Sequence, residues 1–155
     1  MKIIIAGSRG FNDYELLQSI CDSIVLDIRS SNPPNIEIVS GKAKGADLLG
    51  ERYANNRDIP VKEFPADWKK FGKSAGYKRN EEMAKYSDYL IAFWDFESKG
   101  TKHMIDLAHK HKLKVKVIRW YPTPSTKPIE YKSREEIQQK ERIIKGLFWV
   151  PQDPE

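Results

Sequence analysis

The sequence contains a single cysteine, Cys21, so no disulfide bond can form within the chain. Because Cys21 falls in an apolar helical pattern, we predict a buried structural thiol. No apolar stretch approaches the roughly 20 residues that a membrane-spanning helix needs. The apolar run at residues 3–6 stops at Gly7 and is too short for the core of a signal peptide. These absences argue against a disulfide-stapled secreted domain and a membrane protein, and we expect a cytoplasmic protein.

Two common nucleotide-binding fingerprints are also absent. The sequence has no Gly-x-x-x-x-Gly-Lys-[Ser/Thr] P-loop and no Gly-x-Gly-x-x-Gly dinucleotide motif. His103, His109 and His111 share one predicted helix, but no cysteine or carboxylate accompanies them at zinc-ligand spacing. We therefore expect neither a metal ion nor a resident cofactor.

The charge excess is moderate. The formal net charge is +5, which suits either a nucleic-acid surface or basic loops around an anionic small molecule. Four lysines near the last predicted strand resemble a nucleic-acid stripe: Lys110, Lys112, Lys114 and Lys116. Cations at a helix end and on an alternating edge strand explain these lysines more simply.

Strand and helix patterns alternate five times between residues 2 and 120. Apolar runs predict strands at residues 2–6, 36–40, 60–64, 89–94 and 115–120. Helices are predicted from about residue 13, over 46–56, from about 78 to 86 and from about 101 to 111, with a long connection at 65–77. The alternation favours a Rossmann-like three-layer α/β fold, with a five-stranded parallel sheet in the order 3-2-1-4-5 and helices on both faces.

The chain changes character after Trp120. We expect residues 1–120 to form the Rossmann-like domain and residues 121–155 to form a linker, a helical extension and a docking tail. A charged helix is predicted over residues 133–145, with a capping-box spacing between Ser133 and Glu136. The apolar residues 147–150 then need a surface to cover them, on their own domain or on a neighbouring chain.

Three loops of one design follow predicted strands and open predicted helices. They span residues 7–10, 40–47 and 97–101. Their glycines let the backbone approach a ligand, and the helix N-termini behind them supply free N–H groups and partial positive charge. In an open parallel sheet the ligand lies off the carboxyl ends of the strands, where the winding reverses. We therefore predict a pocket for a phosphate-bearing nucleotide or nucleotide-derived ligand at that edge.

Charged and aromatic side chains accompany these loops. Cations at the three loops are Arg9, Lys42, Lys44, Lys99 and Lys102. In the connection before the fourth strand, Lys73, Lys78 and Arg79 are candidates to hold phosphates, Arg79 in bidentate fashion. Trp68 and Tyr77 are candidates to stack on a base or cover the pocket. Asp47 is expected either to bond a ribose hydroxyl or to brace its own loop.

Five segments, in this order, resemble the YspA/CpYpsA-related branch of the SLOG superfamily. They are GSR at residues 7–9, SGKAKGAD at 40–47, FPADW at 64–68, GKSAGYKRN at 72–80 and FWDFESKGT at 93–101. The resemblance covers roughly residues 1–120 and implies a Rossmann-like fold with a pocket for nucleotides or nucleotide-derived ligands. The positions that match its ligand loops are Gly7, Ser8, Arg9, Gly41, Gly45, Asp47, Arg79, Asn80, Ser98, Gly100 and Thr101.

The same resemblance bears on catalysis, because the superfamily includes the Lonely Guy phosphoribohydrolases. Those enzymes pair an arginine with a glutamate shortly after a Gly-Thr. Arg79 resembles that arginine, but residues 102–104 read Lys-His-Met after Gly100-Thr101, so the glutamate is missing. The candidate catalytic residues are Arg79, Asp95 and Glu82, and Asp47, Glu81 and Glu97 are further carboxylates that nothing in the sequence separates.

Three functions therefore stay open. The first is binding of a nucleotide-derived ligand such as an ADP-ribose-like or cyclic-nucleotide signal, which needs no catalytic base. The second is cleavage of the N-glycosidic bond of a nucleoside monophosphate. The third is binding of single-stranded nucleic acid, as DprA-type members of the superfamily do, and is less favoured as a partner. The resemblance also implies self-association, since related SLOG proteins commonly dimerise.

Overall fold

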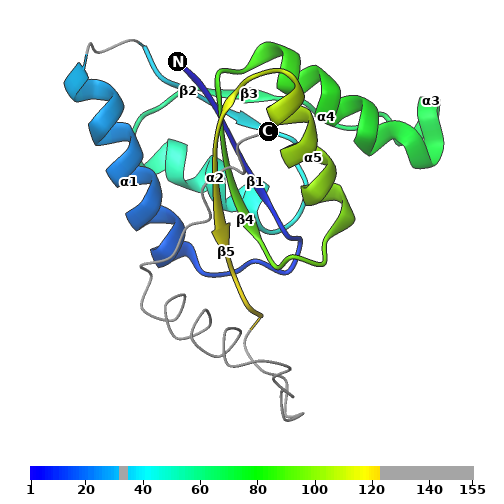
Figure 1. Ribbon diagram of the computed structural model, residues 1–155, viewed down its shortest axis with the longest axis horizontal. Helices are drawn as coiled ribbons and strands as arrows, with labels where there is room; N and C mark the ends of the chain where they lie inside the picture. Colours follow the sequence, from blue (N-terminus) through cyan, green and yellow to red (C-terminus); the bar gives the residue numbers. More distant parts are fainter. Residues whose placement is uncertain (32–34, 123–155) are drawn as a thin grey trace.

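A computed structural model of the chain describes residues 1–31 and 35–122 (Figure 1). The elements are β1 (Lys2–Gly7), α1 (Tyr14–Ser31), β2 (Glu37–Ser40), α2 (Ala46–Asn56), β3 (Val61–Glu63), α3 (Trp68–Phe71), η1 (Gly72–Ser74), α4 (Ala75–Tyr86), β4 (Tyr89–Trp94), α5 (Lys99–Lys110) and β5 (Lys114–Arg119). All neighbouring strands pair in parallel, in the order β3-β2-β1-β4-β5. The predicted α/β fold and strand order are confirmed.

Helices cover both faces of the sheet, and α1 and α2 lie on the opposite side from α4 and α5 (Figure 1). Alternate residues of the central strands divide between the two layers. Ile3 and Ile5 pack in the cluster under α1 and α2, whereas Ile4 packs in the cluster under α4 and α5. Because β1 is buried on both sides, its sequence is a continuous apolar run rather than an alternating one.

The winding of the sheet reverses between β1 and β4. The chain runs outward from β1 through β2 to β3, then returns to β4 beside β1 and continues outward to β5. The loops that leave β1 and β4 therefore separate toward opposite faces and leave a crevice at their carboxyl ends. This topology selects one edge of the sheet as the expected place for a ligand.

The connection between β3 and β4 is more helical than the sequence indicates. The sequence predicts only a long connection over residues 65–77, but α3 and η1 lie within it, and α4 begins at Ala75 rather than at Lys78. The Asp67 carboxylate accepts a hydrogen bond from the Lys70 N–H at 3.0 Å and caps α3. Gly72, with φ +55°, ends that helix. Gly72, which suggests a loop in the sequence, therefore acts here as the stop signal of a short helix.

Two further predictions concern Cys21 and the tail. Cys21 is fully buried in the first core cluster, and burial raises the pKa of its thiol, so the predicted structural role is confirmed. The helix predicted over residues 133–145 and the apolar residues 147–150 lie outside the described residues. Self-association, expected from the resemblance and from that apolar segment, stays a prediction. None of the described helices combines the length and apolar character needed to span a membrane.

Candidate functional site

A cavity of about 70 Å³ lies at the carboxyl ends of β1 and β4, where the winding reverses. Its walls come from the turns after β1, β2 and β4 and from helix α4. The lining residues are Ala6, Gly7, Arg9, Ala43, Asp47, Arg79, Asn80, Met83, Ser98, Gly100, Thr101 and Met104. The structure therefore brings together, around one cavity, residues from all three glycine loops and from the GKSAGYKRN segment.

Two helix N-termini face this cavity. Asp47 belongs to the first turn of α2, and Gly100 and Thr101 belong to the first turn of α5. The first N–H groups of a helix have no intrahelical partner, and the helix dipole is positive at this end. Both turns therefore offer the cavity N–H donors and partial positive charge, an arrangement that suits an anion.

Glycine is required where the loops after β1 and β2 meet. Gly45 has φ +84°, and a Cβ there would lie 2.4 Å from the Ser8 carbonyl oxygen and 2.6 Å from that of Arg9. A side chain at this position would therefore strain its own backbone and collide with a neighbouring one. The close approach of the two loops places the first turn of α2 beside the end of β1.

Arg79 links α4 to the loop after β2. Its Nη1 donates a hydrogen bond to the Gly41 carbonyl oxygen, and its Nε donates to the Asn80 Oδ1 at 3.0 Å. Burial lowers the pKa of Arg79, the nearby Asp47 carboxylate opposes that change, and the charge of Arg9 adds to it. Two guanidinium groups therefore act on the same small region, and an anion between them would relieve their repulsion.

Asp47 is the buried carboxyl group of the site. It is 5% exposed, and its Oδ2 accepts a hydrogen bond from the Ala43 N–H at 3.3 Å. Burial raises the pKa of Asp47 to about 6, although Arg79 acts to lower it. A Cβ at Gly41 would lie 2.8 Å from the Asp47 Oδ2 and 3.0 Å from the Arg79 Nη1. Gly41 therefore leaves room for the carboxylate and the guanidinium to approach each other.

The loop after β4 is held by Asp95. The Asp95 Oδ1 accepts hydrogen bonds from the N–H groups of Glu97 at 2.9 Å and Ser98 at 2.8 Å. The Asp95 N–H donates to the Ser8 Oγ at 3.1 Å and joins this loop to the one after β1. Asp95 and Ser8 therefore shape the loops around the cavity, and neither is among its lining residues.

Asn80 connects α4 to the first turns of α5. Its Nδ2 donates to the Gly100 carbonyl oxygen at 3.4 Å and lies 3.2 Å from the Nδ1 of His103. Burial lowers the pKa of His103, which favours a neutral ring whose Nδ1 accepts from Asn80. The sequence suggests for His103 only a zinc-ligand role, whereas in the fold the ring is a hydrogen-bond partner of Asn80. Among residues 1–31 and 35–122, no three His, Cys, Asp or Glu side chains lie close enough to hold a metal ion.

Some predicted site residues do not reach the cavity. The Lys42 Nζ pairs with the Glu51 Oε1 at 2.9 Å and the Glu63 Oε1 at 3.2 Å instead. Three predicted lysines are exposed without lining it: Lys44, Lys73 and Lys99. Glu82 is exposed on α4, and Trp68 is exposed on α3. Conversely, three lining residues are not among those predicted from the sequence: Ala43, Met83 and Met104. The two methionines are apolar residues at helical spacing, which indicates core packing, and Ala43 has no polar side-chain group.

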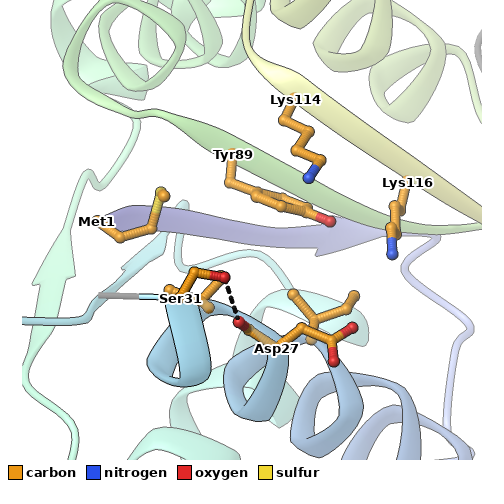
Figure 2. A pocket seen from close by; sticks show the side chains of 8 residues that line it. Met1, Asp27, Ser31, Tyr89, Lys114 and Lys116 are labelled. Carbon is orange, nitrogen blue, oxygen red and sulfur yellow. Dashed lines mark hydrogen bonds between the residues drawn. The ribbon is translucent and has the colours of Figure 1, made fainter. Parts of the chain in front are cut away.

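A larger cavity, of about 300 Å³, lies at the amino ends of β4 and β5. In Figure 2 Asp27 of α1 lies on one side of it and Lys114 and Lys116 of β5 lie on the other. The last turn of α1 borders it, so the nearest helix end is a carboxyl terminus with partial negative charge. Because it is lined by charges of both signs and bordered by this negative helix end, the larger cavity suits an anion less well than the smaller cavity does.

Comparison with known families bears on the first half of the domain. The model of the YspA, cpYpsA-related SLOG family matches residues 1–71. The match includes the loops after β1 and β2 and Trp68, whereas Arg79, Asn80 and the loop after β4 lie beyond it. The resemblance seen in the sequence is thus confirmed over residues 1–71. A search of curated proteins finds no match to the chain.

Proposed function

We propose that this chain, whose residues 1–71 match the model of the YspA, cpYpsA-related SLOG family, binds a phosphate-bearing, nucleotide-derived ligand. The observation that carries the proposal is the cavity between the first turns of α2 and α5, which Arg9 and Arg79 also line. Helix N-terminal N–H groups and two guanidinium groups together match the charge and the acceptor oxygens of a phosphate.

The size of the cavity indicates how much of the ligand enters it. The cavity volume of about 70 Å³ is slightly larger than the volume that two water molecules occupy in liquid water, roughly 30 Å³ each. Pockets that enclose whole small molecules occupy roughly 300–1,000 Å³. The phosphate end of the ligand therefore enters, and the sugar and base extend outward over the surrounding helices. An ADP-ribose-like or cyclic-nucleotide compound would each present such an end.

Asp47 supports a second candidate function, cleavage of the N-glycosidic bond of a nucleoside monophosphate. A carboxyl group with a pKa of about 6 holds a proton for part of the time near neutral pH, as a general acid must. Asp47 would donate that proton to the departing base while a water molecule adds to the sugar carbon and returns its own proton to the Asp47 carboxylate, giving free base and ribose phosphate. Of the carboxylates considered from the sequence, Asp47 lines the cavity, whereas Asp95 holds a loop and Glu82 is exposed.

One experiment separates these functions. Purified protein is titrated calorimetrically with adenosine monophosphate, cyclic adenosine monophosphate and ADP-ribose, and each mixture is then chromatographed. Saturable binding with intact ligand supports the binding function, and release of adenine from the monophosphate supports the hydrolase. If none of the three compounds binds and no nucleotide co-purifies by mass spectrometry, the proposal is contradicted.

A further inference from the structure

Trp68 exposes an aromatic ring in the immediate neighbourhood of the cavity. Its side chain is 52% exposed, although tryptophan is one of the most strongly buried residue types on average. Among the described residues, no aromatic ring stacks on the indole and no cation lies over it. A large apolar face left open in this way is typical of a contact surface for another molecule.

The backbone that carries Trp68 is well fixed. Trp68 is the first residue of α3, which Asp67 caps at one end and Gly72 ends at the other. The Phe71 ring of the same turn lies under the Lys78 Nζ at 4.1 Å, which ties α3 to α4. An indole held on a short, capped helix loses little conformational freedom when a ligand contacts it.

The Trp68 indole lies beside Arg79, the phosphate ligand of the proposed function. A Cβ at Gly76 would lie 3.4 Å from the Trp68 Cη2 and 3.7 Å from the Arg79 Nη2. The tip of the indole and the guanidinium therefore border the same point on α4. The neighbouring exposed aromatic, Tyr77, is engaged differently, since its ring meets His103 edge-on at 4.4 Å. Trp68 is thus the ring with an open surface next to Arg79.

We infer that Trp68 is the stacking platform for the base of the ligand. The inference rests on the proposed function and narrows it: the ligand carries a planar base about one ribose away from the phosphate that Arg79 holds. A bare sugar phosphate then fills only half of the site. Stacking on a tryptophan face is tolerant of base identity, because every base has a π surface, and purines, with the larger ring system, bind more strongly than pyrimidines.

The test compares two probes that differ only in the base. Adenosine monophosphate and ribose 5-phosphate are titrated by calorimetry into the wild type, Trp68→Ala and Trp68→Phe, with Leu26→Ala as a control for loss of an exposed apolar side chain on α1. We expect the wild type to prefer the nucleotide by about tenfold or more. Trp68→Ala should abolish that preference and leave ribose 5-phosphate affinity unchanged, and Trp68→Phe should retain part of it.

The outcomes separate this inference from the function beneath it. If ribose 5-phosphate and the nucleotide bind equally to the wild type, or if Trp68→Ala keeps the preference, the stacking role is wrong while the phosphate site stands. Equal weakening of both probes by Trp68→Ala, with thermal unfolding as a check of the fold, shows a structural role for the indole instead. If neither probe binds the wild type, the proposed function fails and the inference fails with it.

Discussion

At the scale of single residues, Arg79 joins the parts of the candidate site that lie far apart in the sequence. It bonds the Gly41 carbonyl oxygen, 38 residues away in the sequence, and its guanidinium lies close to the Asp47 carboxylate. Arginine is suited to this position because its fork of donors can hold a carbonyl and still present N–H groups to a phosphate. The guanidinium is therefore both a structural link and the expected phosphate ligand.

We predict that Arg79→Ala weakens binding of adenosine monophosphate by about tenfold or more, since a charged hydrogen bond contributes roughly 1.5–3 kcal/mol. Calorimetric titration measures the change. Arg57→Ala is the matched control, because Arg57 pairs with Asp22 at 2.8 Å, away from the cavity, and should leave the affinity unaltered. Equal affinity of Arg79→Ala and the wild type would place the phosphate elsewhere.

Asp47 gives a prediction about pH and stability. Its pKa rises from 3.8 to about 6 on folding, because burial disfavours the charged form. The folded state therefore binds the proton more tightly than the unfolded state does. The stabilisation is present in full below pH 4 and is lost as the pH rises through 6. A shift of this size corresponds to about 3 kcal/mol.

We expect Asp47→Asn to remove this dependence of stability on pH. The free energy of unfolding of the variant, relative to that of the wild type, should therefore increase by up to about 3 kcal/mol between pH 4 and pH 7. Urea denaturation at a series of pH values measures it. Asp22→Asn is a control for which stability should depend on pH in the opposite direction, because the hydrogen bond from Arg57 lowers the pKa of Asp22. Its stabilisation is lost as the pH falls. Parallel curves for Asp47→Asn and the wild type would contradict the argument.

At the scale of elements, Gly45 determines how α2 meets the end of β1. We predict that Gly45→Ala destabilises the fold by roughly 1–3 kcal/mol, because its φ of +84° and two carbonyl oxygens within 2.6 Å leave no place for a Cβ. Chemical denaturation tests this. Gly10→Ala is the control, since nothing lies within 4 Å of a Cβ there and its effect should be small. Similar losses in both variants would show that crowding at Gly45 is not the cause.

The regular elements follow closely from the sequence, because buried parallel strands leave continuous apolar runs and the helices between them have amphipathic spacing. The strand order follows from chain connectivity. The start of α4 is harder to predict: Gly72 and Gly76 both indicate a loop locally, whereas in the fold Gly72 ends α3 and Gly76 lies in the first turn of α4, next to the tip of the Trp68 indole. Glycine alone does not distinguish these roles.

The candidate site was predictable only in part for a related reason. Loop glycines and helix starts are local signals, and the three loops that carry them meet around one cavity at this edge of the sheet, while ligand binding there stays a prediction. Side-chain partners are tertiary. Lys42 resembles a phosphate ligand in the sequence, yet Glu51 and Glu63 reach it from α2 and β3. Asp95 resembles a catalytic carboxylate, yet the N–H groups of its own loop occupy it.

At the scale of the whole molecule, the positive charge is divided between the two edges of the sheet. Arg9 and Arg79 border the cavity at the carboxyl edge. Lys110, at the end of α5, and Lys112 and Lys114, before and at the start of β5, lie toward the amino edge. These lysines do not line the cavity, so the stripe that resembles a nucleic-acid surface is separate from the phosphate site that we propose. The ligand that we propose is accordingly one compact anion rather than a long polyanion.

We therefore predict a shallow salt dependence for binding of adenosine monophosphate. A protein that contacts six to ten phosphates of a nucleic acid loses roughly 10³–10⁵ in affinity between about 50 and 200 mM salt, because each contact releases counterions. One phosphate in a cavity lacks such a counterion layer, so we expect less than about a tenfold change over the same range. Calorimetric titrations at several salt concentrations, with a thymidine oligonucleotide in parallel, measure both. Tighter binding of the oligonucleotide with a steep slope would instead establish single-stranded nucleic acid as the ligand.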